Sequence, residues 1–165
     1  MRDIEFRAKT EVEGWLYGNI IHITEDYKGE ELQECDKWFL ITPEGAEFET
    51  QKETIGQFTE MYDKNGKKIY EGDIVLTQPC RDKMWSEKAK YKRLLGIVKY
   101  NVEHTNKFGK SPEKIQYWDA GWKVEIVNED DEKKYSYRNY SLFYKCEVVG
   151  NIHDNKDLLG GGEWS

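Results

Sequence analysis

The residues best suited to chemistry in this sequence form a basic and aromatic segment, residues 81–93. Its six cations face two acids, Asp82 and Glu87, and aromatic residues are interleaved with them. The candidate binding residues are Arg81, Lys83, Trp85, Lys88, Lys90, Tyr91, Lys92 and Arg93. Cations beside rings that stack on bases are what a groove for single-stranded nucleic acid needs. We favour a simpler interpretation, a charged loop whose Trp85 packs into the core.

Other patterns that could support catalysis, metal binding or cofactor binding are weak. The three histidines are far apart, and the spaced pair His153 and Asp157 lies in a polar terminal segment. No cysteine stands beside a histidine base in the sequence, and no glycine-rich phosphate loop occurs. Asp63 and Asp73 lie in predicted turns, where an aspartate carboxylate serves the backbone. We therefore predict no catalytic residue, no metal site and no cofactor.

The charge of the chain is unevenly distributed along the sequence. The net charge is −7, and aromatic residues make up 14% of the 165 residues, which favours a folded protein. Residues 1–56 carry 6 basic and 14 acidic side chains, whereas residues 57–128 carry 14 basic and 10 acidic ones. An acidic chain binds phosphate backbones poorly, although a basic middle leaves room for a local patch. No apolar run is long enough to span a membrane, and no signal sequence is evident, so we expect a cytoplasmic protein.

The elements that must position these residues are mostly short strands. Alternating or β-branched and aromatic stretches predict strands near residues 4–8, 15–23, 38–42, 57–62, 69–70, 74–77, 94–100, 122–127 and 144–152. The polar, acidic residues 24–37 predict a loop. Residues 78–93 fit either a long loop or one amphipathic helix. Ser111-Pro112-Glu113 resembles a helix start, and residues 154–159 predict one helical turn.

The strongest local signal is a hairpin at Asn65-Gly66. Both residue types tolerate a positive φ, so the pair predicts a type I′ turn between strands. A second turn is expected at Glu71-Gly72-Asp73. The succession of short strands predicts a mainly β fold: a small SH3-like barrel, or a strongly bent antiparallel sheet, with an N-terminal β extension and little helix. The expected parts are residues 1–56, residues 57–159 and a flexible tail, residues 160–165.

Three segments of the sequence resemble the YopX family of phage and prophage proteins. They are residues 54–75, which contain the Asn65-Gly66 hairpin and Glu71-Gly72-Asp73, an opening segment at residues 4–8, and a closing segment at residues 147–159. The family usually has Gly-Leu where this chain has Glu60-Met61, and Pro where it has Lys156. The resemblance implies a phage or prophage origin, a bacterial host cytoplasm and a mostly β fold. It implies no catalytic residues.

Two functions from different classes follow from the sequence. The first is a non-enzymatic interaction protein that binds another protein or a second copy of itself, suggested by the aromatic content, the strands and the lack of catalytic motifs. The second is a small barrel that binds nucleic acid through residues 81–93 and 107–114. The net charge disfavours the second, and an enzyme ranks third. We expect no membrane partner.

Overall fold

The computed structural model describes residues 4–29, 31–77, 80–81, 91–105, 117–127 and 145–160. The chain divides into two compact units, Met1–Glu60 (unit 1) and Met61–Ser165 (unit 2). The domain boundaries that the sequence suggested at residues 56 and 159 stay a prediction.

Unit 1 is an antiparallel sheet in which strands adjacent in the chain are mostly adjacent in space. Its elements are β1 (Phe6–Thr10), β2 (Gly14–Lys28), β3 (Glu31–Ile41), β4 (Glu47–Glu49), the 3-10 helix η1 (Lys52–Thr54) and β5 (Gly56–Tyr62). The strand order is β4-β3-β2-β1-β5, and β6 (Lys68–Tyr70) follows β5 in the sheet. Ala8 in β1 and Leu40 in β3 are fully buried.

The predicted loop at residues 24–37 is wrong, because residues 24–28 belong to β2 and residues 31–37 belong to β3. β2 and β3 pair antiparallel from Asn19↔Ile41 to Lys28↔Glu31, with an irregularity in register after Ile23. Gly29, with a φ of +72°, lies in the turn between them. Backbone hydrogen bonds hold the two strands together and do not depend on the side chains. The ribbon can therefore form without alternating apolar residues, the pattern from which a strand is predicted and which this segment lacks.

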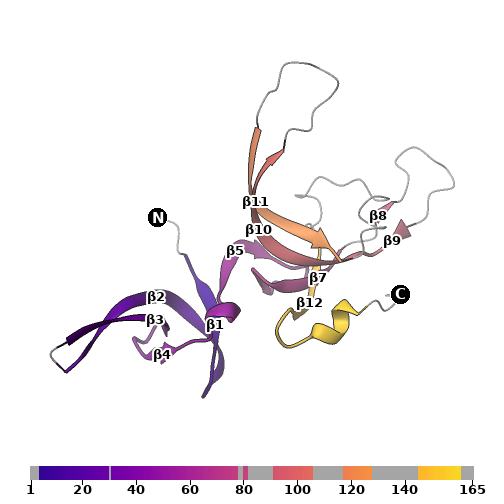
Figure 1. The fold of residues 1–165 in the computed structure, drawn as a ribbon. Helices are drawn as coiled ribbons and strands as arrows, with labels where there is room; N and C mark the ends of the chain where they lie inside the picture. The colour runs from indigo at the N-terminus through magenta and orange to yellow at the C-terminus, as the bar shows by residue number, and fades with distance from the viewer. Residues whose placement is uncertain are drawn as a thin grey trace. The chain divides into compact units, whose positions relative to one another are not determined.

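We call residues 23–37 the arm. β1 pairs with β2 only up to Gly18, and β4 pairs with β3 only at Phe39–Ile41. Within the described residues, the two strands of the arm therefore pair with each other alone. Figure 1 shows them extending as a curved, two-stranded ribbon past the ends of β1 and β4.

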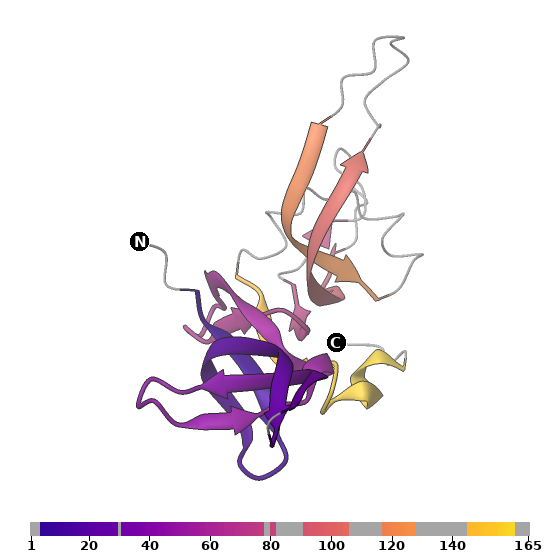
Figure 2. The same cartoon turned by 60° about the vertical axis from the view of Figure 1, so that its left-hand side comes forward.

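Unit 2 contains a second antiparallel sheet, of order β11-β10-β7-β12, and a separate short strand pair. Besides β6, its elements are β7 (Asp73–Leu76), β8 (Cys80–Arg81), β9 (Tyr91–Lys92), β10 (Leu95–Thr105), β11 (Tyr117–Ile126), β12 (Glu147–Asn151) and the 3-10 helix η2 (Lys156–Leu159). β12 comes late in the chain but pairs with β7, with a shift in register between Val148 and Gly150. In Figures 1 and 2, β10 and β11 run side by side and bend along their length.

β7 lies at the centre of the core of unit 2, and all four of its residues are buried. Val75 belongs to the larger cluster, with Ile69, Leu94, Val98, Val124, Ile126 and Cys146. Ile74 and Leu76 belong to a second cluster with Leu95, against which η2 packs Leu158 and Leu159. Successive residues of a strand point to opposite faces, so β7 contributes to both clusters.

The fold class predicted from the sequence is confirmed: the protein is mainly β, with a strongly bent antiparallel sheet. Neither of the two larger sheets closes into a barrel in the part that the structure describes, and that part contains no α-helix. The helical turn predicted near residues 154–159 is present as η2. Cys80–Arg81 and Tyr91–Lys92 pair as strands, while residues 82–90 and the predicted helix start at residues 111–113 lie outside the described residues. No described helix is long and apolar enough to cross a membrane.

The hairpin at Asn65-Gly66 is present, but its turn differs from the predicted type I′. The Gly66 N–H donates to the Asp63 carbonyl at 3.0 Å, and the Asp63 N–H donates to the Lys67 carbonyl at 2.8 Å. Gly66 has a φ of +81°, whereas Asn65 is not in the left-handed region. The loop is therefore a three-residue one, Lys64-Asn65-Gly66, which needs a single left-handed residue at its end. The Asp63 side chain favours this geometry, because it holds the Asn65 N–H at 2.7 Å.

Candidate functional site

The structure describes only part of the basic segment that the sequence singled out. Lys83, Trp85, Lys88 and Lys90 lie outside the described residues, as does the segment 107–114. The backbones of Arg81, Tyr91 and Lys92 lie in the paired strands β8 and β9. Nucleic-acid binding by residues 81–93 thus stays a prediction.

Arg93 is the one residue of that set whose side chain the structure describes, and it has internal partners. Its Nε donates to the Thr77 carbonyl at 2.9 Å, and its Nη2 lies 3.2 Å from Glu147 Oε2. The same Glu147 oxygen accepts from Lys64 Nζ at 2.5 Å. These two cations, Lys64 first, lower the pKa of Glu147. The Arg93 guanidinium therefore joins Thr77, the residue after β7, to Glu147 of β12, which is a structural role.

Asp63 and Asp73 both serve turns, as the sequence predicted. Asp63 Oδ1 accepts from the Asn65 and Lys67 N–H groups, and Asp73 Oδ2 accepts from the Tyr70 N–H at 2.8 Å. In addition, Asp63 Oδ2 accepts from the Val148 N–H at 3.1 Å. That bond ties the hairpin to β12 and could not be inferred from local sequence. Within the described side chains, no group of three or more His, Cys, Asp or Glu could hold a metal ion.

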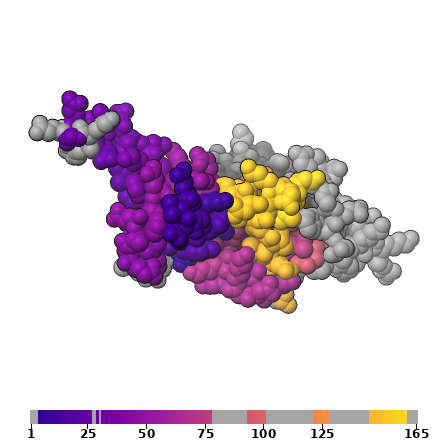
Figure 3. All heavy atoms as spheres, turned by 90° about the horizontal axis from the view of Figure 1, so that it is seen from below, coloured from indigo at the N-terminus to yellow at the C-terminus, as the bar shows by residue number. Residues whose placement is uncertain are grey.

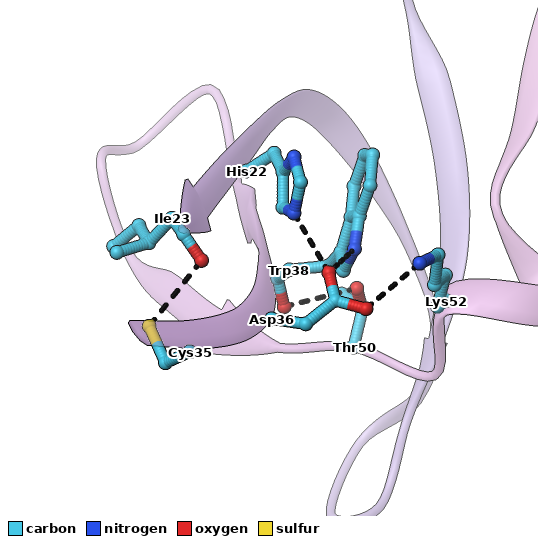
Figure 4. Close-up of polar contacts among 7 residues, drawn as sticks. All are labelled: His22, Ile23, Cys35, Asp36, Trp38, Thr50 and Lys52. Atoms are coloured by element: carbon cyan, nitrogen blue, oxygen red, sulfur yellow. Dashed lines mark hydrogen bonds and ion pairs between the residues drawn. The ribbon is translucent and has the colours of Figure 1, made fainter. Parts of the chain in front are cut away.

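A different cluster, not predicted from the sequence, surrounds Asp36 at the base of the arm (Figure 4). Asp36 Oδ1 accepts from His22 Nε2 at 2.7 Å and from Trp38 Nε1 at 2.9 Å, and Oδ2 accepts from Lys52 Nζ at 2.8 Å. We call these four residues the Asp36 cluster. They come from β2, β3 and η1, so one carboxylate connects three elements of unit 1.

The pairing of β2 with β3 positions the rings of the Asp36 cluster. His22 and Trp38 are direct cross-strand partners, and their rings stack with centroids 4.0 Å apart and planes at 12°. Lys52 Nζ lies 5.5 Å from the centroid of the Trp38 ring, within cation–π range. The Trp38 carbonyl accepts from both the N–H and the Oγ1 of Thr50. Trp38 is therefore held at its backbone, its indole N–H and its ring.

A register shift in β3 aims Asp36 at these partners. The pairs Ile23↔Lys37 and Glu25↔Glu34 leave one extra residue in β3, a bulge. Next to the bulge, the Cys35 thiol donates to the Ile23 carbonyl at 3.4 Å. The hydrogen bonds from Lys52, His22 and Trp38, in that order, lower the pKa of Asp36 to about 2. Asp36 stays ionised at any physiological pH, so the cluster keeps its arrangement.

The arm beyond the Asp36 cluster is acidic and exposed. Glu25 and Glu34 are direct cross-strand partners, and Glu31 is also exposed. Among the described side chains, none of these three glutamates forms an ion pair, whereas Asp26 pairs with Lys37 Nζ at 3.0 Å. Figure 3 shows the end of the arm, in indigo, standing out from the remainder of unit 1.

Exposed apolar side chains accompany these acids on one face of the ribbon. Ile21 is 44% exposed and Leu32 is 52% exposed. Alternation along β2 places Ile21 on the face of Glu25, and alternation along β3 places Leu32 on the face of Glu34. The cross-strand pair joins these two sets, so the face combines apolar and acidic groups. Sequence reasoning did not identify this face, because the polar composition of residues 24–37 predicted a loop and not a ribbon exposed on both sides.

These observations define a class of protein: a two-unit, mainly β protein. The carboxylates of Asp63 and Asp73 stabilise its turns, and the carboxylate of Asp36 positions surface side chains. Within that class, the chain belongs to the YopX protein family, whose family model matches residues 5–160. This confirms the resemblance seen in the three sequence segments.

Among solved structures, the chain is similar to the crystal structure of protein EF1440 from Enterococcus faecalis. The two are 21% identical, the match covers 96% of this chain and 99% of that chain, and the TM-score is 0.40. No curated protein matches the chain.

Proposed function

We propose that this YopX-family protein is a non-enzymatic interaction protein whose contact surface is the arm together with the Asp36 cluster. The observation that carries the proposal is the arm itself, two strands that pair with each other alone in the described part of the chain. A lone two-stranded ribbon is marginally stable in water. Its length adds little to the core of unit 1, so a contact with a partner is the better reason for it. A phage or prophage origin and work in a bacterial cytoplasm belong to the same proposal.

The Asp36 cluster supports this function because it holds a large ring in place before any partner binds. Trp38 is half-buried, and its ring contacts both His22, at a centroid distance of 4.0 Å, and the Lys52 ammonium, at 5.5 Å. Binding costs less when side chains at the contact are already fixed. Tryptophan is also among the residues that contribute most to binding energy at protein interfaces. The base of the arm is therefore suited to anchor a partner.

Shortening the arm tests the proposal. Replacement of residues 26–33 by Asn-Gly closes the ribbon directly after the pair Glu25↔Glu34 and leaves the Asp36 cluster intact. Light scattering and affinity capture from a lysate of the bacterial host would compare the shortened chain with the wild type, after thermal unfolding shows that both fold. We expect self-association or a captured protein with the wild type, and its loss in the shortened chain.

Two outcomes would contradict the proposal. One is a wild-type chain that stays monomeric and captures nothing. The other is a partner or oligomer that the shortened chain retains with unchanged affinity, since the contact surface would then lie elsewhere.

A further inference from the structure

We infer that the partner of the arm is a basic, partly apolar protein segment that adds as an extended strand to the open edge of β3. This inference rests on the proposed function above and specifies its partner. It is argued from three features of the arm: a backbone edge that no described strand covers, acids without an ion pair among the described side chains, and an exposed leucine.

The first feature is the outer edge of β3 between Glu31 and Lys37. On one side these residues pair with β2, and on the other side no described strand covers them, because β4 pairs only with Phe39–Ile41. Half of the backbone N–H and C=O groups of such an edge face outward and bond to water. An extended segment can replace that water with a ladder of hydrogen bonds, which is a common mode of peptide recognition.

The second feature is the charge of the arm, which specifies the sign of the partner. Glu25 and Glu34 lie directly opposite each other, and like charges in that position destabilise a strand pair. Lys37 and Lys52 are already engaged by Asp26 and Asp36. A lysine or arginine from a partner would relieve the repulsion between the two glutamates. The same charge disfavours the arm of a second copy as the added strand, and it repels nucleic acid.

The third feature is the alternation along the edge, which specifies the pattern of the partner. Leu32 and Glu34 are two residues apart on one face, so an added strand meets an apolar group and a carboxylate in turn on that face. Because alternate residues of a strand share a face, the matching segment carries an apolar and a basic residue in turn at every second position. The inferred partner is therefore a basic β-forming segment rather than a purely polar polycation.

A labelled peptide of repeated Val-Val-Lys-Lys is the probe for this inference, because each of its faces presents apolar and basic residues in turn. Its binding would be followed by fluorescence anisotropy and by amide hydrogen exchange of residues 31–37. One control peptide replaces alternate Val by Pro, which keeps the charge but cannot form a strand ladder, and another replaces Lys by Glu. The double variant E25Q/E34Q removes the acids of the arm, and E44Q/E47Q removes two exposed acids of unit 1 outside it.

The expected result is binding of the Val-Val-Lys-Lys peptide to the wild type, with slower exchange of the amides in residues 31–37. E25Q/E34Q and the Pro-containing peptide each weaken binding roughly tenfold, and raising the salt weakens it as well. E44Q/E47Q leaves it unchanged, and the Glu peptide does not bind.

Each other outcome overturns the inference. Equal binding of the Pro-containing peptide would show attraction by charge without strand addition, and equal binding to E25Q/E34Q would place the contact elsewhere. If no peptide binds while the wild type shows an arm-dependent dimer or captured protein, the proposed function stands and the basic strand is wrong. If shortening the arm also changes nothing, both fail.

Discussion

Two aspartates, one in each unit, show opposite ways in which a carboxylate can organise a β protein. Asp63 is buried, with 7% of its surface exposed, and its carboxylate accepts from the backbone N–H groups of Asn65, Lys67 and Val148. Asp36 is exposed, and its carboxylate accepts from three side chains, those of His22, Trp38 and Lys52. Asp63 therefore fixes the path of the backbone, whereas Asp36 positions exposed side chains on the surface.

The pKa values of the two carboxyl groups have different causes. Burial acts to raise the pKa of Asp63, but the backbone N–H groups of Lys67, Val148 and Asn65 together outweigh it and lower the pKa. The pKa of Asp36 is lowered chiefly by the Lys52 ammonium, in a hydrated position where salt screens the attraction. A buried carboxylate bonded to backbone is therefore expected to stabilise the fold, while an exposed one bonded to side chains is expected to affect recognition.

The largest expected effect is that of Asp63→Asn. The amide that replaces the carboxylate has a single acceptor oxygen, so at least one of the part-buried hydrogen bonds from Asn65, Lys67 and Val148 is lost. We expect a loss of about 3 kcal/mol in the free energy of unfolding, measured by urea denaturation. Asp157→Asn, at an exposed position in η2, is the matched control and should change little. Equal stability of the two variants would remove the contrast between Asp63 and Asp36.

The pH dependence of unfolding sharpens the same contrast. Because the pKa of Asp63 is lower in the folded protein, its contribution is fully present above the unfolded pKa, about 3.9, and is lost as the pH falls toward the folded pKa. The wild type should therefore lose stability steeply below about pH 4. Urea denaturation at several pH values should give a flatter curve for Asp63→Asn, and parallel curves would contradict the assignment.

Arg93→Gln is expected to have a smaller effect on stability. The guanidinium donates hydrogen bonds to the Thr77 carbonyl and to Glu147. Glu147 precedes Val148, whose N–H donates to Asp63. Loss of these contacts should lower the free energy of unfolding by about 1 kcal/mol. Lys156→Gln, at an exposed position, serves as the control in thermal or urea unfolding. A variant as stable as this control would show that Arg93 is available for another role, including the nucleic-acid binding suggested by its sequence context.

Glu60→Gly is expected to stabilise the protein. Glu60 has a φ of +63°, in the left-handed region, at the position where the family usually has Gly. Relief of this strain should raise the free energy of unfolding by about 0.5–1 kcal/mol, less the entropy that Gly adds to the unfolded chain. Glu47→Gly in β4, where the backbone is not left-handed, should instead destabilise. If both variants lose stability, the contacts of the Glu60 side chain outweigh the strain.

The smallest expected effect concerns the ionisation of Asp36. The Trp38 indole N–H donates to this carboxylate, so its NMR shift should report the Asp36 titration, with a midpoint near the pKa of about 2. Lys52→Gln removes the largest cause of the lowered pKa and should move that midpoint upward. A midpoint near the ordinary value of about 3.9 in the wild type would mean that the Asp36 cluster does not persist in solution.

The sequence by itself determined the features that depend on neighbours in the chain. The hairpin between β5 and β6, the turn at Gly72 and the service of Asp63 and Asp73 to nearby N–H groups all follow from residues within four positions of one another. An aspartate side chain reaches that far without help from the remainder of the fold. The mainly β class and the membership of the YopX family could be inferred for the same reason, since each strand signal and each of the three family segments is continuous in the chain.

Only the tertiary structure decided the features that depend on which strands pair and in what register. The bond from the Val148 N–H to Asp63 joins residues 85 positions apart. The bulge in β3 brings Asp36 to His22, and the arm forms from residues whose polarity predicted a loop. A ladder of backbone hydrogen bonds is nearly independent of side-chain type, so a ribbon exposed on both faces leaves no periodic signal in the sequence.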